Sequence, residues 1–154
     1  MALTFRTATP PEHDEARRVL WTAFTPYVRA LGREITADHY TFLAAAILRG
    51  GVYLALDGGE IVGVAVTEPR DGGIYIDRLG VVPTRQRGGV GSFLLERVEE
   101  VARSSGLEQL SLVTAEMAEG NIRLYRRFGF EIVRRGPLPN GMDGHTRVFM
   151  VKPL

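Results

Sequence analysis

The chain has 154 residues, of which 45% are hydrophobic and 24% are charged, and its formal net charge is +1 at pH 7. This length fits one domain with a sizeable core, and the near-neutral charge argues against a surface dedicated to nucleic acid. The absence of cysteine excludes disulfides, zinc–thiolate sites and a cysteine acyl-enzyme.

No apolar run is long enough to span a membrane. The first six residues lack the basic-then-apolar order of a signal peptide. We therefore expect a cytoplasmic protein without membrane association. The three histidines, His13, His39 and His145, are scattered without the spacing of metal ligands, so no metal site is expected.

The predicted elements begin with a strand at residues 3–7. The segment Thr9-Pro10-Pro11-Glu12 is typical of a capping box at a helix start, with proline in the first turn. Apolar residues at helical spacing extend this helix over residues 16–27, and Pro26 is expected to end or bend it. A second helix is indicated by apolar residues between 40 and 47.

Three strands are predicted next, at residues 52–56, 61–67 and 74–82. Asp57-Gly58-Gly59 and Asp71-Gly72-Gly73 separate them and predict hairpin turns. The three strands therefore form an antiparallel meander.

The segment at residues 81–92, VVPTRQRGGVGS, joins the last of these strands to an amphipathic helix. A glycine loop at this position gathers backbone N–H groups at a helix N-terminus, where they and the helix dipole attract phosphate. Glycine lets a ligand approach the backbone because no Cβ stands in the way. An ordinary tight turn between strand and helix also favours glycine, so the loop alone leaves both interpretations open.

The remaining elements complete a mixed domain. The helix after the loop has an apolar face over residues 93–103 and Gly106 at its end. The last predicted elements are a strand at 110–114, a helix at 121–128 closed by Gly129, and strands at about 130–135 and 146–151. The order βααβββαβαββ predicts an α/β (mixed α+β) single domain over residues 1–154.

The segment at residues 121–130, NIRLYRRFGF, is the second informative stretch, and by itself it is an ordinary amphipathic helix. Together with the glycine loop it resembles the GNAT superfamily of acyl-CoA-dependent N-acyltransferases. That family has a Q/R-x-x-G-x-G/A loop after a strand and a closing Y-x-x-x-G-F motif. The matching residues here are Gln86, Gly89 and Gly91 in the loop, and Tyr125, Gly129 and Phe130 in the closing motif.

The resemblance implies a mostly antiparallel, partly parallel sheet, acetyl-CoA as donor and a primary amine as acceptor. It places the pyrophosphate over the loop amides and the pantetheine along the preceding strand, where an N–H, expected to be that of Val81, polarises the thioester carbonyl. Arg85 and Arg87 are further candidates for phosphate contacts. The residues implied in cofactor binding are Leu79, Gly80, Val81, Gln86, Arg87, Gly88, Gly89, Val90, Gly91, Ser92 and Tyr125.

One position departs from the family pattern. Many members carry asparagine seven residues before the tyrosine, and this chain has Ala118 there. Asn121 lies one helical turn before Tyr125 and is a candidate replacement for that cofactor contact. The sequence favours a different role for Asn121, as the N-cap of its helix.

Tyr125 is the candidate acid for the departing thiolate, because the family places this phenol beside the sulfur and because phenol and thiol pKa values lie within about two units. Asp77 and Glu116 are candidates for the base that takes the ammonium proton, with bulk water as the alternative. Strand alternation predicts that Asp77 shares a face with Leu79 and Val81, where it is equally suited to pair with an arginine.

In the family, acceptor specificity comes from the first two helices and the last hairpin. Tyr27, Arg33 and Glu34 are the candidate acceptor residues in the first region, and residues 137–145 form a loop suited to act as a rim or lid. The acceptor, a small molecule or a peptide, stays open. The resemblance also implies that an exposed strand of the last hairpin is able to pair with a second copy as a homodimer.

Three other functions are alternatives to an acyltransferase. A dinucleotide-binding oxidoreductase conflicts with the sequence, because Leu94 occupies the last glycine position of G-x-G-x-x-G and Thr114 stands where an acidic residue is expected. A nucleic-acid module would use the arginines of residues 123–135, but their charge is balanced elsewhere and no aromatic platform accompanies them. A non-catalytic acyl-CoA-binding or regulatory domain of the same fold stays open, because fold does not establish activity.

Overall fold

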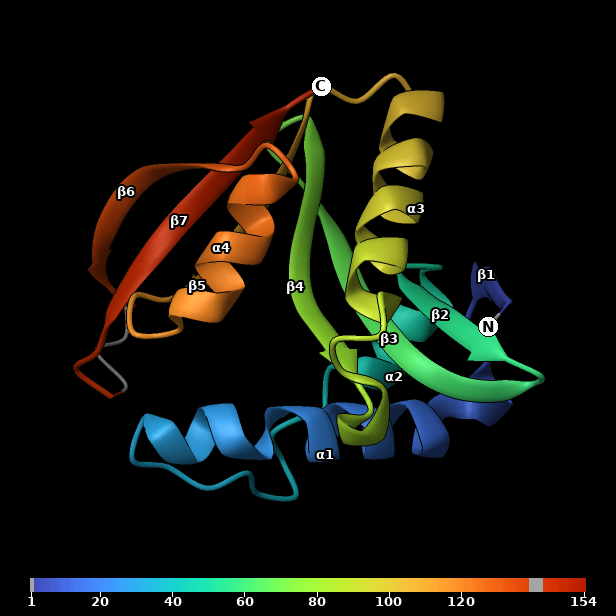
Figure 1. The fold of residues 1–154 in the computed structure, drawn as a ribbon. Helices are drawn as coiled ribbons and strands as arrows, with labels where there is room; N and C mark the ends of the chain where they lie inside the picture. Colours follow the sequence, from blue (N-terminus) through green and yellow to red (C-terminus); the bar gives the residue numbers. More distant parts are fainter. Residues whose placement is uncertain (1, 139–142) are drawn as a thin grey trace.

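The described residues form seven strands and four α-helices, connected in the predicted order βααβββαβαββ (Figure 1). The computed structural model describes residues 2–138 and 143–154. The strands are β1 (Leu3–Thr7), β2 (Val52–Asp57), β3 (Glu60–Arg70), β4 (Gly73–Val81), β5 (Gln109–Ala115), β6 (Glu131–Pro137) and β7 (Thr146–Pro153). The helices are α1 (His13–Ala30), α2 (Leu43–Leu48), α3 (Val90–Ser104) and α4 (Glu119–Arg127).

All strands belong to one sheet in the order β1-β2-β3-β4-β5-β7-β6. Every neighbouring pair is antiparallel except β4 and β5, which confirms the mostly antiparallel, partly parallel sheet. The parallel contact joins only Ile74–Ile76 to Leu110–Leu112. Beyond it the two strands diverge, as Figure 1 shows, and residues 78–81 of β4 pair with β3 alone.

A β-bulge in β4 changes which side chains face which helix. Arg78 lies opposite Val66 and Ile76 lies opposite Thr67, so Asp77 is the extra residue. Leu79 consequently packs in the same hydrophobic cluster as Ile76. Strict alternation through Asp77, which the sequence predicts, does not hold.

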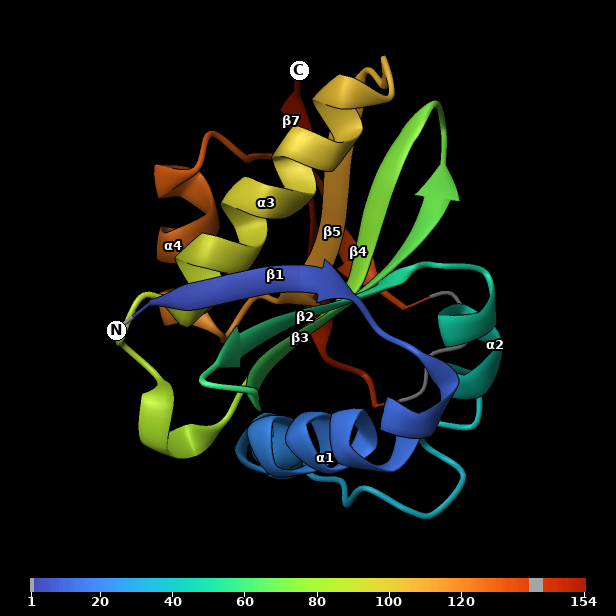
Figure 2. The same cartoon turned by 90° about the vertical axis from the view of Figure 1, so that its right-hand side faces the viewer.

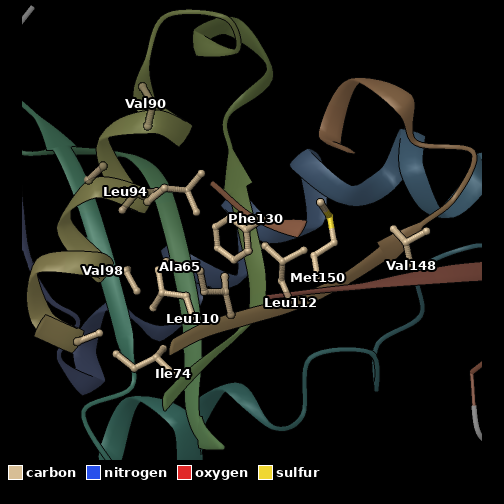
Figure 3. Close-up of a cluster of buried hydrophobic side chains, with 14 of the residues drawn as sticks. Ala65, Ile74, Val90, Leu94, Val98, Leu110, Leu112, Phe130, Val148 and Met150 are labelled. Atoms are coloured by element: carbon tan, nitrogen blue, oxygen red, sulfur yellow. The ribbon is translucent and has the colours of Figure 1, made fainter. Parts of the chain in front are cut away.

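The helices cover the two faces of the sheet in pairs (Figure 2). Helices α1 and α2 bury their apolar faces with Leu54 and Val64 in one cluster. Helix α3 buries Leu94 and Val98 in the other, to which α4 adds partly buried side chains; Figure 3 shows this second cluster. None of the helices in the described part of the chain is both long and apolar enough to cross a membrane.

Pro26 does not end α1. The helix continues for one more turn, to Ala30. Tertiary contacts account for this continuation. Val28 and Leu31 are buried at 6% exposure each, and the Tyr27 hydroxyl accepts a hydrogen bond from the backbone N–H of Ala115 at 2.9 Å. Packing against the sheet therefore compensates for the hydrogen bond that proline cannot donate.

Gly73 lies next to the paired residues of β4 and β5, and its substitution tests how closely the two strands approach there. A Cβ at this position would lie 2.1 Å from the carbonyl oxygen of Gln109, so strand backbone would have to move. We expect Gly73→Ala to lower the free energy of unfolding by about 3 kcal/mol, measured by urea denaturation.

Gly136→Ala is the matched control, because no atom lies within 4 Å of a Cβ built there. We expect it to change stability by less than about 1 kcal/mol. Equal stability of the two variants would show that β4 and β5 are not in close contact at Gly73.

Candidate active site

The diverging ends of β4 and β5 open into a cleft of about 1180 Å³. The end of α1, the loop before α3 and helix α4 complete its walls. The cleft gathers most of the residues that the sequence predicts to be functional: Tyr27, Arg33, Asp77, Leu79, Gly80, Val81, Arg85, Gln86, Arg87, Gly89, Gly91, Ser92, Asn121 and Tyr125.

Four predicted residues have other positions or partners. Glu116 is exposed and accepts a hydrogen bond from Arg135 Nε at 2.9 Å, and Glu34 is likewise paired with Arg29 at 3.1 Å. The other two are loop residues: the Gly88 N–H donates to the carbonyl of Arg85, and the Val90 side chain is buried in the core. None of the four lines the cleft.

The N-terminus of α3 presents free backbone donors to the cleft. Gly89 is the N-cap in a left-handed conformation, with φ of 86°. Within the described part of the chain, the N–H groups of Val90, Gly91 and Ser92 have no hydrogen-bond acceptor. A Cβ at Gly91 would be in ordinary van der Waals contact with the Val81 side chain at 3.9 Å. Such a helix terminus is suited to bind an anion.

Arginines surround this anion site. Three exposed ones, Arg87, Arg123 and Arg127, line the cleft and have no acidic partner among the described residues. Arg87 is held in a left-handed conformation with φ of 68°. Arg85 has a different role, because it forms an ion pair with Asp57 on the β2–β3 hairpin. We call the part of the cleft formed by the α3 N-terminus with Arg87, Arg123 and Arg127 the cofactor end. Its hydrogen-bond donors fit a ligand with several negative charges.

The open edge of β4 provides backbone groups deeper in the cleft. The Val82 N–H donates to the Val62 carbonyl on β3 at 3.0 Å. Because successive N–H groups of a strand point in opposite directions, the N–H of Val81 points toward the open side. The Gln86 side chain donates to the Val81 carbonyl at 3.2 Å and so attaches the loop to the end of the strand.

Two tyrosines that line the cleft, Tyr27 and Tyr125, lie near each other. Tyr125 is half-buried and packs edge-to-face on Phe130, with ring centroids 5.9 Å apart. Burial, with the nearby Tyr27 phenol adding to it, raises the pKa of Tyr125 to about 12. The phenol is therefore protonated at neutral pH. Tyr27 is fixed by its hydrogen bond to the end of β5.

Asp77 lies in the cleft but already has a partner. Its carboxylate accepts a hydrogen bond from Arg78 at 2.9 Å, and both side chains are about 30% exposed. The Arg78 guanidinium also lies 5.5 Å from the ring of Phe42. Across the described residues, no group of three histidine or acidic side chains is arranged to hold a metal ion.

A buried ion pair at the rim of the cleft was not predictable from the sequence. Arg147 Nη2 lies 2.8 Å from Asp143 Oδ2, and their side chains are only 7% and 3% exposed. The hydrogen bonds from Arg147 lower the pKa of Asp143 to about 2. The only sequence signal is an acid and a base four residues apart. Residues 139–142 of the predicted rim or lid loop lie outside the described residues.

Asn121 is not the N-cap of α4, because the helix begins two residues earlier at Glu119. Asn121 is exposed and lines the cleft one turn before Tyr125. Its placement leaves the cofactor contact as the remaining role proposed for it.

Known proteins match this chain in sequence. The sequence model of the acetyltransferase (GNAT) family matches residues 13–130. The IAA acetyltransferase of Azospirillum brasilense is 40% identical over 104 residues, which are 66% of this chain and 66% of that protein. N-acetyltransferase family 8 member 2 of Rattus norvegicus is 29% identical over 122 residues, 75% of this chain and 53% of that protein. The chain thus spans between about half and two thirds of these relatives.

Solved structures share the fold at low sequence identity. The PaiA N-acetyltransferase of Thermoplasma acidophilum, in complex with coenzyme A, superposes with a TM-score of 0.80 at 15% identity and full coverage of both chains. Ard1 of Thermoplasma volcanium also gives 0.80, at 20% identity over 100% of this chain and 99% of that one. The fold and the match over residues 13–130 together show that the chain belongs to the acetyltransferase (GNAT) family.

Proposed function

We propose that the protein transfers an acetyl group from acetyl-CoA directly to a primary amine, without a covalent acyl-enzyme. One arrangement supports this proposal most strongly: the unpaired amides of Gly91 and Ser92 in α3, the open edge of β4 and the Tyr125 phenol all line a single cleft. When bound, acetyl-CoA would supply an activated thioester, so the protein needs no nucleophile of its own. Family membership supports the same donor.

The residues at the cofactor end fit the anionic part of this donor. The N–H groups of Val90, Gly91 and Ser92 would hold the diphosphate, and Arg87 would add a charge-assisted hydrogen bond. The exposed arginines of α4 complement the remaining negative charge. The open edge of β4 offers donors and acceptors to the amides of the pantetheine arm.

Positioning contributes most of the expected rate enhancement. Holding a neutral amine against a thioester removes much of the entropic barrier of a bimolecular reaction. The Val81 N–H, which points to the open side of β4, would donate to the carbonyl oxygen where negative charge develops. Tyr27 and the strand end that it binds would form the opposite wall.

Tyr125 would hold a proton for the departing sulfur. Its raised pKa widens the gap from an ordinary thiol beyond the two units expected from the sequence. The same burial raises the pKa of a thiol placed beside it, so both groups shift in the same direction. Proton donation by the phenol is therefore still feasible.

The ammonium proton of the acceptor is assigned to water. Asp77 is engaged with Arg78, and Glu116 lies outside the cleft beside Arg135. We propose that Asp77 positions Arg78 and that Glu116 has no part in the reaction.

A thiol-release assay tests the activity. We expect acetyl-CoA to release free thiol when a panel of primary amines is added, with tertiary amines as the inactive control. Tight acetyl-CoA binding without release for any amine would contradict the proposal and would support a non-catalytic acyl-CoA-binding domain.

Replacing Tyr125 with phenylalanine tests the proton donor. We expect Tyr125→Phe to lower kcat by about 100-fold or more, while the Kd for acetyl-CoA changes by less than about threefold because the ring remains. Tyr53→Phe is the matched control: Tyr53 is a partly buried tyrosine stacked on Phe5 and does not line the cleft. Near wild-type turnover in Tyr125→Phe would remove the phenol from the mechanism.

Arg87→Gly separates the charge of Arg87 from its backbone conformation. Glycine accepts the left-handed conformation without strain, so stability is expected to change by less than about 1 kcal/mol. The loss of one charge-assisted bond is expected to weaken coenzyme A binding about tenfold in calorimetry.

Asp71→Gly is the control, because Asp71 has φ of 52° in the β3–β4 turn and does not line the cleft. Coenzyme A affinity should stay at the wild-type value in this variant. If both variants bind coenzyme A as tightly as the wild type, Arg87 does not contact the phosphates.

A further inference from the structure

One part of the cleft is not used by the proposed cofactor contacts. It is lined by the segment between α1 and α2 and by the bulged part of β4, and we call it the acceptor end. Its charged residues are Arg33, Asp38, Asp77 and Arg78, with His39 among them. The inference below rests on the proposed function, because the acceptor amine would occupy this end.

Arg33 is a half-buried cation without a carboxylate. It lines the cleft, and among the described residues no side chain forms an ion pair or hydrogen bond with its guanidinium. Arg29, four residues earlier, differs in both respects: it is exposed and paired with Glu34. The free guanidinium of Arg33 therefore has five donors available to a ligand.

Arg78 lies on the facing strand with its geometry fixed. Asp77 holds it at 2.9 Å and the Phe42 ring lies 5.5 Å from it. One carboxylate leaves most of its donors free. Asp77 offsets one of the two guanidinium charges, and the exposed carboxylate of Asp38 brings the formal sum at this end to zero. Among the described residues, the guanidinium of Arg33 is the charge left without a direct partner.

The charges of both guanidinium groups reach His39, so Arg33 and Arg78 lie near the same part of the cleft. Burial first, and then the charges of Arg78 and Arg33, lower the pKa of His39. Its ring packs against Tyr40 with centroids 5.1 Å apart. A histidine that is neutral at pH 7 adds a hydrogen-bonding group here without adding charge.

The acceptor end provides few carboxylates for a ligand with a second positive charge. Its one carboxylate without a guanidinium partner is Asp38, which is fully exposed and accepts a hydrogen bond from the Thr36 hydroxyl. Solvent screens such a charge. A diamine or polyamine would therefore face Arg33 and Arg78 without a buried counter-charge.

We infer that the acceptor is an amine that also carries a carboxylate, as amino acids do, and that Arg33 binds this carboxylate with Arg78 beside it. The planar guanidinium of Arg33 matches a carboxylate in a two-bond geometry. The single unpaired guanidinium of Arg33 complements the single negative charge of a carboxylate better than the double charge of a phosphate.

The carboxylate takes no part in the chemistry. The carbonyl carbon of the acetyl group forms a bond to the amine nitrogen and loses its bond to sulfur. Starting from the ammonium form, the nitrogen gives up two protons to water, the sulfur gains one from Tyr125, and Tyr125 regains one from water. Arg33 and Arg78 therefore select and orient the acceptor, and neither is assigned a proton.

Bisubstrate conjugates test this inference without knowledge of the natural acceptor. The sulfur of coenzyme A is joined through CH2–CO to the amino group of glycine, β-alanine or 4-aminobutyrate, and each conjugate is compared with its carboxamide. In calorimetry we expect the carboxylate form of at least one chain length to bind about 10- to 100-fold more tightly than its carboxamide.

Arg33→Gln should reduce this preference to less than about threefold while leaving the affinity for coenzyme A itself unchanged, which shows that the variant is folded. Arg29→Gln removes one positive charge from the same segment outside the cleft and should keep the full preference. Equal binding of carboxylate and carboxamide at every length, or a preference that survives in Arg33→Gln, would overturn the inference. Failure of coenzyme A and all conjugates to bind would instead overturn the proposed function.

Discussion

Three residue pairs of parallel sheet join β4 to β5, and the position of every group in the cleft depends on where that pairing stops. The bulge at Asp77 lies immediately beyond the last pair and turns β4 away from its neighbour. The strand keeps its hydrogen bonds to β3, so it stays rigid while its other edge is open. Unpaired backbone groups need water or a ligand. The divergence thus creates an extended binding edge in the interior of the sheet.

The distribution of arginine partners divides the cleft into two ends. Arg85 and Arg147 have carboxylate partners, Asp57 and Asp143, and hold the walls in place. The arginines of the cofactor end and Arg33 have no such partner among the described residues, and they are the ones proposed to contact ligands. The net charge of +1 gives no indication of this separation, because carboxylates elsewhere balance the arginines.

Features set by neighbouring residues were predictable from the sequence. The antiparallel meander, the glycine loop at the start of α3 and the left-handed Gly129 after α4 all appear where local patterns predict them. The same loop and the Tyr125 motif led to the family that the comparison confirms. These features depend on backbone conformation and periodicity, which a few residues determine.

Features set by distant contacts were not predictable. The bulge at Asp77 arises from its register with β3 and shifts Leu79 to the other face. Helix α1 continues past Pro26 because its last turn packs on the sheet. Glu34 and Glu116 have the right chemistry for site residues, yet each pairs with an arginine outside the cleft. A single sequence gives no means to choose between such partners.

We propose that the α3 N-terminus and the open edge of β4 bind coenzyme A together. Amide chemical shifts of 15N-labelled protein during titration with coenzyme A test it most directly. If both elements bind the coenzyme, the amide shifts are saturable, are largest at Val90, Gly91 and Ser92, and extend to Val81 on β4. A titration that leaves these amides unmoved, or that moves amides only at another surface, would contradict it.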